Sequence, residues 1–182
     1  INQSLVRAGH IPTEIFSKTF LDTFVFIGGC GTALSLVLAL YIASKQSHNR
    51  KMSFVALPSA LFNISEIAVF GFPIIFNLTM LIPFILTPVI LTLISASAIK
   101  TGLVPAVTQS VEWTIPVLLS GYQATGSVSG SLLQLFNLLV GVFIYMPFVR
   151  RSEKQETGKF KQAVRQMEQD MAAGERAGVI PA

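Results

Sequence analysis

Long stretches without a charged residue are the feature that most restricts what this chain can fold into. Residues 23–44, 67–99 and 113–149 form three such runs of 22, 33 and 37 residues. A helix needs about 20 predominantly apolar residues to cross the hydrocarbon core of a bilayer, so each run is long enough to span a membrane. Only 12% of the 182 residues are charged, which is low for a soluble domain. The sequence therefore predicts an all-α integral membrane protein.

Several other classes of protein are excluded by composition. The single cysteine, Cys30, rules out a disulfide scaffold, and two histidines far apart in the chain rule out a zinc cluster. The sequence has no phosphate-binding loop and no nucleophile paired with a base at a recognisable spacing. We therefore expect no metal and no cofactor, and the sequence leaves open whether the chain takes part in an enzymatic reaction.

The apolar pattern predicts three membrane-spanning helices, at residues 20–44, 79–98 and 131–149. The first contains the glycine-rich stretch 28–31, which has two interpretations: close packing of helices, or a local break beside the path of a solute. The third ends near Tyr145, which we expect at the membrane interface, where aromatic residues are favoured.

Residues 52–78 are apolar but are interrupted by helix-breaking and polar residues, among them Pro58, Glu66, Gly71 and Pro73. Proline disrupts the hydrogen bonding of a helix interior, and non-helical backbone at membrane depth is tolerated only inside protein or beside a watery cavity. We therefore predict two short half-helices that meet at a polar tip, which together form a re-entrant hairpin rather than a crossing.

Basic residues follow the first span, at 45–51, and the third span, from Arg150 onward. Because cytoplasmic loops of membrane proteins are enriched in Lys and Arg, both regions are predicted to be cytoplasmic, with the hairpin and two full spans between them. The tail 152–182 is predicted to be helical, with apolar residues spaced by three or four. These apolar residues could lie on the membrane surface, pair with another helix or lead into a further domain. Because acids are interleaved with the basic residues and the protein is predicted to lie in a membrane, the tail is predicted to be a cytoplasmic anchor that binds no nucleic acid.

Glu66 is the leading candidate for a functional group, because an ionisable residue within an apolar segment is costly and usually marks a site. It lies beside Asn63 and Ser65, and such a polar tip suits a neutral, hydroxylated solute. The alternative is that Glu66 caps a half-helix or pairs internally. Trp113, the only tryptophan, is predicted to stack on a sugar ring, or else to anchor the chain at the membrane interface.

The ordered set of motifs resembles the membrane subunit (IIC) of bacterial phosphotransferase-system sugar transporters of the lactose/cellobiose/chitobiose family. The resemblance covers about residues 20–151 and includes a Gly-Gly-x-Gly span, a Trp-Thr-x-Pro segment and a closing Tyr-x-Pro-Phe. The matching positions of the hairpin region are Phe62, Asn63, Glu66, Phe70, Gly71, Pro73, Asn77, Ile82, Pro83 and Phe84.

This resemblance implies a homodimeric protein of the bacterial inner membrane that imports a disaccharide, which a cytoplasmic IIB partner phosphorylates. It places Glu66 in the catalytic role near the reacting sugar hydroxyl, and Asn63, Glu66 and Trp113 in contact with the substrate. The implied histidine of the site is expected upstream of Ile1, so we expect the chain to be the C-terminal half of the IIC domain. Its parts are then a connecting segment (1–19), the membrane domain (20–151) and a cytoplasmic tail or linker (152–182).

The sequence departs from the family pattern at three positions of the hairpin. Ser65 replaces an asparagine, and Ile67 and Leu78 each replace a proline. An alternative function would explain both these changes and a tail after Arg151 that is longer than the family's: a transporter-like domain that senses sugar and controls a fused signalling domain. An ion-coupled secondary transporter is a second alternative, although Asp22 and Glu66 are the only acids at membrane level and no ion pair is evident from the sequence.

Overall fold

The computed structural model describes residues 15–72, 74 and 77–176, with side chains as far as residue 169. All regular secondary structure in the described part is helical, with no strand, as the sequence predicts. In chain order the elements are α2 (Lys18–Phe20), the π-helix η1 (Leu21–Val25), α3 (Ala33–Ala43), α4 (Ser47–Leu61), α5 (Glu66–Gly71), α6 (Leu78–Lys100), α7 (Leu119–Thr125) and α8 (Val128–Arg176).

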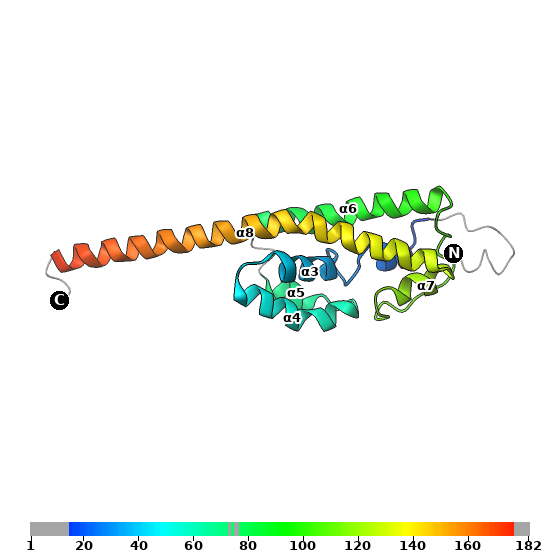
Figure 1. Cartoon of the computed structure of the whole chain (residues 1–182), viewed down its shortest axis with the longest axis horizontal. Helices are drawn as coiled ribbons and strands as arrows, with labels where there is room; N and C mark the ends of the chain where they lie inside the picture. Colours follow the sequence, from blue (N-terminus) through cyan, green and yellow to red (C-terminus); the bar gives the residue numbers. More distant parts are fainter. Residues whose placement is uncertain (1–14, 73, 75–76, 177–182) are drawn as a thin grey trace.

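Two long helices, α6 and α8, pack antiparallel to each other along the long axis of the molecule (Figure 1). The shorter helices pack on the same side of this pair, with α3 against α8 and α4 beside α3. At the opposite end of the bundle, α7 packs against the beginning of α8. The second half of α8 continues past the bundle as a single projecting helix (Figure 1).

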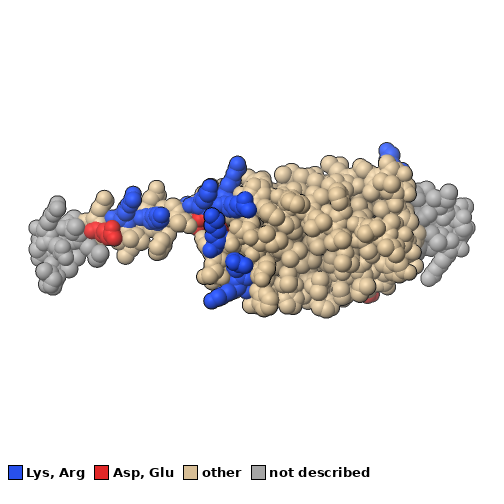
Figure 2. Space-filling model, viewed as in Figure 1, with Lys and Arg blue, Asp and Glu red and all other residues tan. Residues whose placement is uncertain are grey.

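Among the described residues, the helices at Leu78–Lys100 and Val128–Gln169 are long and apolar enough to cross a membrane. Large apolar side chains of α6 such as Ile85, Val89 and Leu93 are exposed. In the space-filling view the body of the molecule is almost free of charge, and basic residues gather where the projecting part of α8 leaves it (Figure 2). The predicted helices at 79–98 and 131–149 are therefore present, and both are candidate membrane spans.

The first predicted span, at residues 20–44, is wrong as a single helix. The chain there forms α2 and η1, then leaves helical geometry between Phe26 and Thr32, and only afterwards forms α3 with 11 residues. Gly28, Gly29, Gly31 and Thr32 all have positive φ angles, a conformation that interrupts a helix. Of the two interpretations, the structure therefore shows the local break.

The break is stabilised by buried polar side chains of α8. The amide of Asn137 donates to the carbonyl of Phe24 at 2.9 Å, and the hydroxyl of Tyr145 donates to the carbonyl of Gly31 at 2.5 Å. Since unpaired backbone groups are costly in an apolar environment, these side chains offset the loss of helical hydrogen bonds. Tyr145 is fully buried, so its ring packs inside the protein, and its predicted depth at the membrane interface stays a prediction.

The predicted half-helices of the hairpin are present as α4 and α5, separated by a tip at residues 62–65. Pro58 lies inside α4, and the helix continues to Leu61, so the break comes later than Pro58 suggests. Pro73 lies outside the described residues. The basic stretch 45–51 is not a loop as predicted, because α4 begins at Ser47 and places Arg50 and Lys51 in its first turns.

Where α8 leaves the bundle, Glu153 anchors it to the start of α4. Its carboxylate accepts hydrogen bonds from the Ser44 hydroxyl, from the backbone amide of Lys45 at 3.0 Å and from the Asn49 amide at 3.1 Å. Nearby, Asn77 donates to the Ser152 hydroxyl at 2.6 Å. The helical tail is confirmed as far as residue 176, and α8 passes through residues 151–152 without interruption. The division of the chain into three parts stays a prediction, and residues 1–14 lie outside the described part.

Candidate functional site

Three interrupted segments of the chain border one open hollow of about 530 Å³, part of it open to solvent. Asn63, Glu66 and Trp113, the three site residues predicted from the sequence, all line it. The other lining residues are Asp22, Phe26, Gly29, Cys30 and Ser65.

The glycine-rich break forms one wall of the hollow and needs its glycines. A Cβ atom on Gly29 would lie 2.7 Å from Cβ of Ser65, and the φ angle of Gly29 is +100°. A Cβ atom on Gly31 would lie 2.2 Å from the ring of Phe84. Any side chain at either position would therefore push the break away from the hairpin tip or from α6.

Asn63 occupies the hairpin tip in the left-handed region, with φ of +60°. Its Oδ1 accepts from the Gly28 amide at 2.8 Å, and its Nδ2 donates to the carbonyls of Trp113 at 2.6 Å and Ile115 at 3.2 Å. The side chain therefore ties together all three walls. Both amide protons are used in this way, so a sugar contact is left to Oδ1 alone.

Glu66 is the first residue of α5 and is exposed at the edge of the hollow. Within the described part of the chain its carboxylate has no hydrogen-bond partner. An unpaired carboxylate can accept two hydrogen bonds from a bound hydroxylated solute. The structure therefore leaves the acid of the tip available to a ligand, and shows no internal partner for it.

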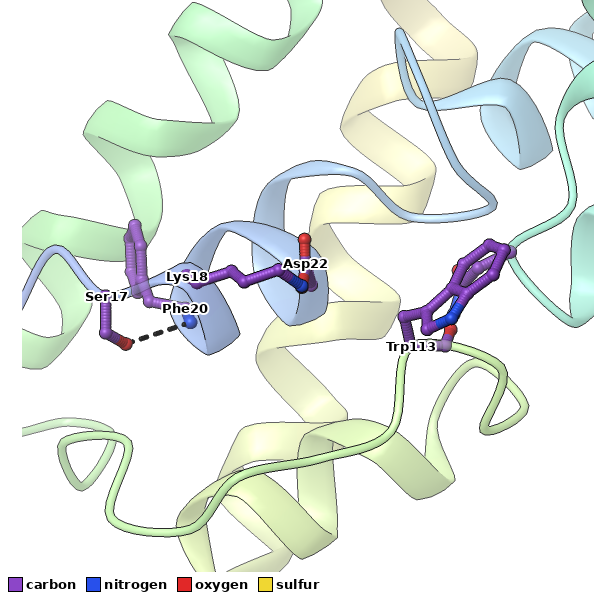
Figure 3. A network of polar contacts seen from close by, with 6 residues as sticks. Ser17, Lys18, Phe20, Asp22 and Trp113 are labelled. Carbon is purple, nitrogen blue, oxygen red and sulfur yellow. Dashed lines mark hydrogen bonds and ion pairs between the residues drawn. The ribbon is translucent and has the colours of Figure 1, made fainter. Parts of the chain in front are cut away.

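Asp22 is a second acid of the hollow, and sequence reasoning did not select it as a site residue. It lies in η1, and its carboxylate forms an ion pair with Lys18 at 2.5 Å (Figure 3). The side chain of Lys18 is 84% exposed, so this pair is weakly held. The signal in the sequence was an acid immediately before an apolar run of residues.

Trp113 lies on the irregular segment between α6 and α7 and is half exposed. Figure 3 shows its indole projecting from this loop, on a different element from Asp22. Its ring lines the hollow, and its backbone carbonyl is held by Asn63. Asn77, a more distant polar residue of the hairpin region, caps α6 instead, where its Oδ1 accepts from the Thr79 amide at 3.0 Å.

Comparison with known proteins gives a consistent result. Residues 1–88 match the family model "Phosphotransferase system, EIIC". The chain is 38% identical over 158 residues to the lichenan permease IIC component of Bacillus subtilis (strain 168), an alignment that covers 85% of this chain and 35% of that protein. It is 36% identical over 148 residues to the cellobiose-specific EIIC component of Geobacillus stearothermophilus, which covers 80% of this chain and 33% of that protein.

A solved structure shows the same fold. The crystal structure of the transporter ChbC, the IIC component of the N,N'-diacetylchitobiose-specific phosphotransferase system, matches with a TM-score of 0.81 and 34% identity. The match covers 88% of this chain and 38% of ChbC. The chain thus spans about a third of the length of these relatives, and its fold is similar to the matched part of ChbC.

Proposed function

Because this chain belongs to the EIIC family of the phosphotransferase system, we propose that it supplies part of the sugar site of a membrane permease. The substrate is a disaccharide of the cellobiose, chitobiose or lactose type, and a IIB partner phosphorylates it during import. One observation carries the proposal: the fold gathers Glu66 and Trp113 from distant segments around a single hollow.

The chemistry of the hollow fits a sugar. The indole of Trp113 offers an apolar face on which the C–H face of a sugar ring can stack. Glu66 accepts hydrogen bonds from sugar hydroxyls, and Asp22, which lines the hollow from η1, is a second acceptor. In this proposal the carboxylate of Glu66 takes the hydroxyl proton while the sugar oxygen bonds to phosphorus and the bond between the phosphoryl group and the partner protein breaks, so that the partner's side chain is the leaving group.

The family membership supports the permease over the sensor, because the relatives are named as transport components. It also supports a location in the bacterial cell membrane, and it favours the sugar permease over an ion-coupled transporter. The proposal further includes a homodimer, which chemical cross-linking in membranes would reveal as a species of twice the monomer mass.

The decisive experiment measures binding of cellobiose and chitobiose to the full-length protein in detergent by calorimetry. Glu66→Gln keeps the size of the side chain and removes its charge. We expect it to weaken sugar binding by about 10-fold or more, since a lost charged hydrogen bond costs roughly 1.5–3 kcal/mol. The matched control is Glu156→Gln, an exposed acid of the tail, which should bind normally. Unchanged affinity in Glu66→Gln, or loss in both variants, contradicts the proposal.

The proposed topology puts the start of α4 and the projecting part of α8 on the cytoplasmic side. Single cysteines at Ser47 and Lys159, both exposed positions, are introduced in a Cys30→Ser background. A membrane-impermeant thiol reagent should label neither one in intact cells and both after permeabilisation. Labelling of either position from outside contradicts the topology.

A further inference from the structure

Gln134, on the inner face of α8, is buried with 1% of its surface exposed and has every hydrogen-bonding position filled. Its Oε1 accepts from the amides of Leu118 at 2.8 Å and Gly121 at 3.1 Å. Its Nε2 donates to the carbonyl of Thr23 at 2.8 Å and to the hydroxyl of Ser120 at 2.9 Å. A side-chain amide offers two acceptor positions and two protons, so this set uses all four.

These partners belong to two different walls of the hollow. Thr23 follows Asp22 in η1, whereas Leu118 ends the segment that carries Trp113, and Ser120 and Gly121 lie in the first turn of α7, which follows it directly. Asn63 joins the glycine-rich break to the Trp113 segment from the side of the hollow. Gln134 joins η1 to the same segment from the α8 side, so its amide is a second and independent link.

The segment after Trp113 also contains a strained residue that α8 holds in place. Leu118 has φ of +77° and ψ of −40°, a conformation that is strained for a non-glycine residue. Its amide donates to Gln134, and its carbonyl accepts from the Ser131 hydroxyl at 2.6 Å. Strain of this kind persists only where surrounding contacts fix the conformation, and here both contacts come from α8.

Asn137 provides a natural comparison three residues further along α8. It is also a buried amide, and its Nδ2 donates to the carbonyl of Phe24 and to the hydroxyl of Ser95 at 2.7 Å. It therefore supports the same η1 wall as Gln134 does. None of these bonds reaches the segment that carries Trp113, so Asn137 stabilises the fold without linking the two walls.

We propose that Gln134 is a positioning residue, which fixes the Trp113 segment against the Asp22 segment and so sets the width of the sugar site. This inference rests on the proposed function only for the identity of the ligand, a sugar. The link that Gln134 forms between the two segments follows from its hydrogen bonds alone. A site whose walls are already in place does not have to order them on binding, and such pre-organisation is a direct contribution to affinity.

The test compares Gln134→Met with Asn137→Leu in the full-length protein, with any tryptophan other than Trp113 replaced by phenylalanine. Methionine keeps the length of the side chain and removes all four hydrogen bonds of Gln134. A second variant, Gln134→Glu, keeps the acceptor positions for Leu118 and Gly121 but loses both protons, donated to Thr23 and Ser120, and it replaces Gln134→Met if that variant does not fold. Thermal unfolding establishes that the variants compared are equally folded at the working temperature.

The first measurement is quenching of Trp113 fluorescence by acrylamide without sugar. We expect the quenching constant to rise about two-fold or more in the Gln134 variant and to stay unchanged in Asn137→Leu. The second measurement is the Kd for cellobiose, which should rise about 10-fold in the Gln134 variant and less than two-fold in Asn137→Leu. Equal quenching in the two variants overturns the inference, as does an equal change of affinity.

The two measurements separate this inference from the proposed function. If the wild-type protein binds no disaccharide, the proposed function fails, but a selective change of Trp113 quenching still supports the positioning role of Gln134. If the wild type binds sugar and Gln134→Met leaves both Trp113 quenching and affinity unchanged, the positioning role is wrong and the proposed function stands.

Discussion

Near its two ends, α4 lies close to two carboxylates that the fold uses in opposite ways. At the hairpin tip, Glu66 is exposed to the hollow and has no hydrogen-bond partner within the described residues. At the start of α4, Glu153 of α8 is buried and accepts hydrogen bonds from Ser44, Lys45 and Asn49. The protein therefore provides hydrogen-bond donors for the carboxylate of Glu153 and none, within the described residues, for that of Glu66.

The difference shows that a carboxylate can either stabilise the fold or remain available to bind a ligand. A carboxylate held by several donors stabilises the fold, because removing it leaves those donors unpaired. A carboxylate with no internal partner contributes little to the fold and keeps its capacity for a ligand. The comparison therefore predicts a division of effects: changes near Glu153 should reduce stability, and changes at Glu66 should reduce sugar binding.

The largest effect on stability is expected for Glu153→Ala. The substitution leaves the Ser44 hydroxyl, the Lys45 amide and the Asn49 amide without their acceptor. A hydrogen bond to a charged group contributes roughly 1.5–3 kcal/mol, so we expect a loss of about 3 kcal/mol or more in the free energy of unfolding. Thermal unfolding of the purified protein measures it as a lower Tm.

Glu156→Ala is the control for that substitution, since Glu156 lies on the same helix and is exposed. Exposed substitutions of this kind change stability by about 0.5 kcal/mol or less. If the two variants unfold at the same temperature, the carboxylate of Glu153 does not anchor α8, and the contrast between the two acids is lost.

The large features of the fold were predictable because they depend on local composition. The spans at 79–98 and 131–149 follow from uncharged runs, and the break near Asn63 follows from polar residues within an apolar segment. Glu66 stood out for the same reason. All of these signals lie within about one helix length of sequence, and each of them describes a segment by itself.

The features that sequence reasoning missed depend on contacts between distant segments. Residues 20–44 are apolar enough for a helix, and only the hydrogen bonds that Asn137 and Tyr145 donate to backbone carbonyls show why the break is tolerated. Glu153 sits among other charges of the tail, so nothing local distinguishes it. The amide of Gln134 satisfies groups 13–111 residues away, which no local pattern reports.

The second prediction concerns the hollow. Gly29→Ala places a Cβ atom 2.7 Å from Cβ of Ser65 at a φ angle of +100°. We expect a loss of about 2 kcal/mol in stability, because the left-handed conformation alone costs roughly 1–2 kcal/mol. The same substitution at Gly158, where nothing lies within 4 Å of the new Cβ, should cause no loss. Equal unfolding temperatures for the two variants would show that the break tolerates a side chain.

The third prediction follows from the ionisation of Glu153, which lies beyond the apolar part of α8. Burial alone raises the pKa of its carboxyl, but the hydrogen bonds from Ser44, Lys45 and Asn49 outweigh it and hold the pKa below its ordinary value. A lowered pKa in the folded state stabilises the protein above the ordinary carboxyl pKa, and this contribution is lost as the pH falls. The Tm should therefore decrease on acidification, and it should do so less steeply in Glu153→Gln.

The smallest effect on stability is expected for Glu66→Gln. The carboxylate donates nothing and accepts nothing from the described residues, so its neutralisation should change the free energy of unfolding by about 0.5 kcal/mol or less in the absence of sugar. Saturating disaccharide should raise the Tm of the wild type, because a ligand that binds only the folded state stabilises it. The same concentration should raise the Tm of Glu66→Gln much less. If the Tm of Glu66→Gln is several degrees below that of the wild type without sugar, Glu66 supports the fold as Glu153 does. The sugar would then need another acceptor in the hollow, and Asp22 is the other carboxylate that lines it.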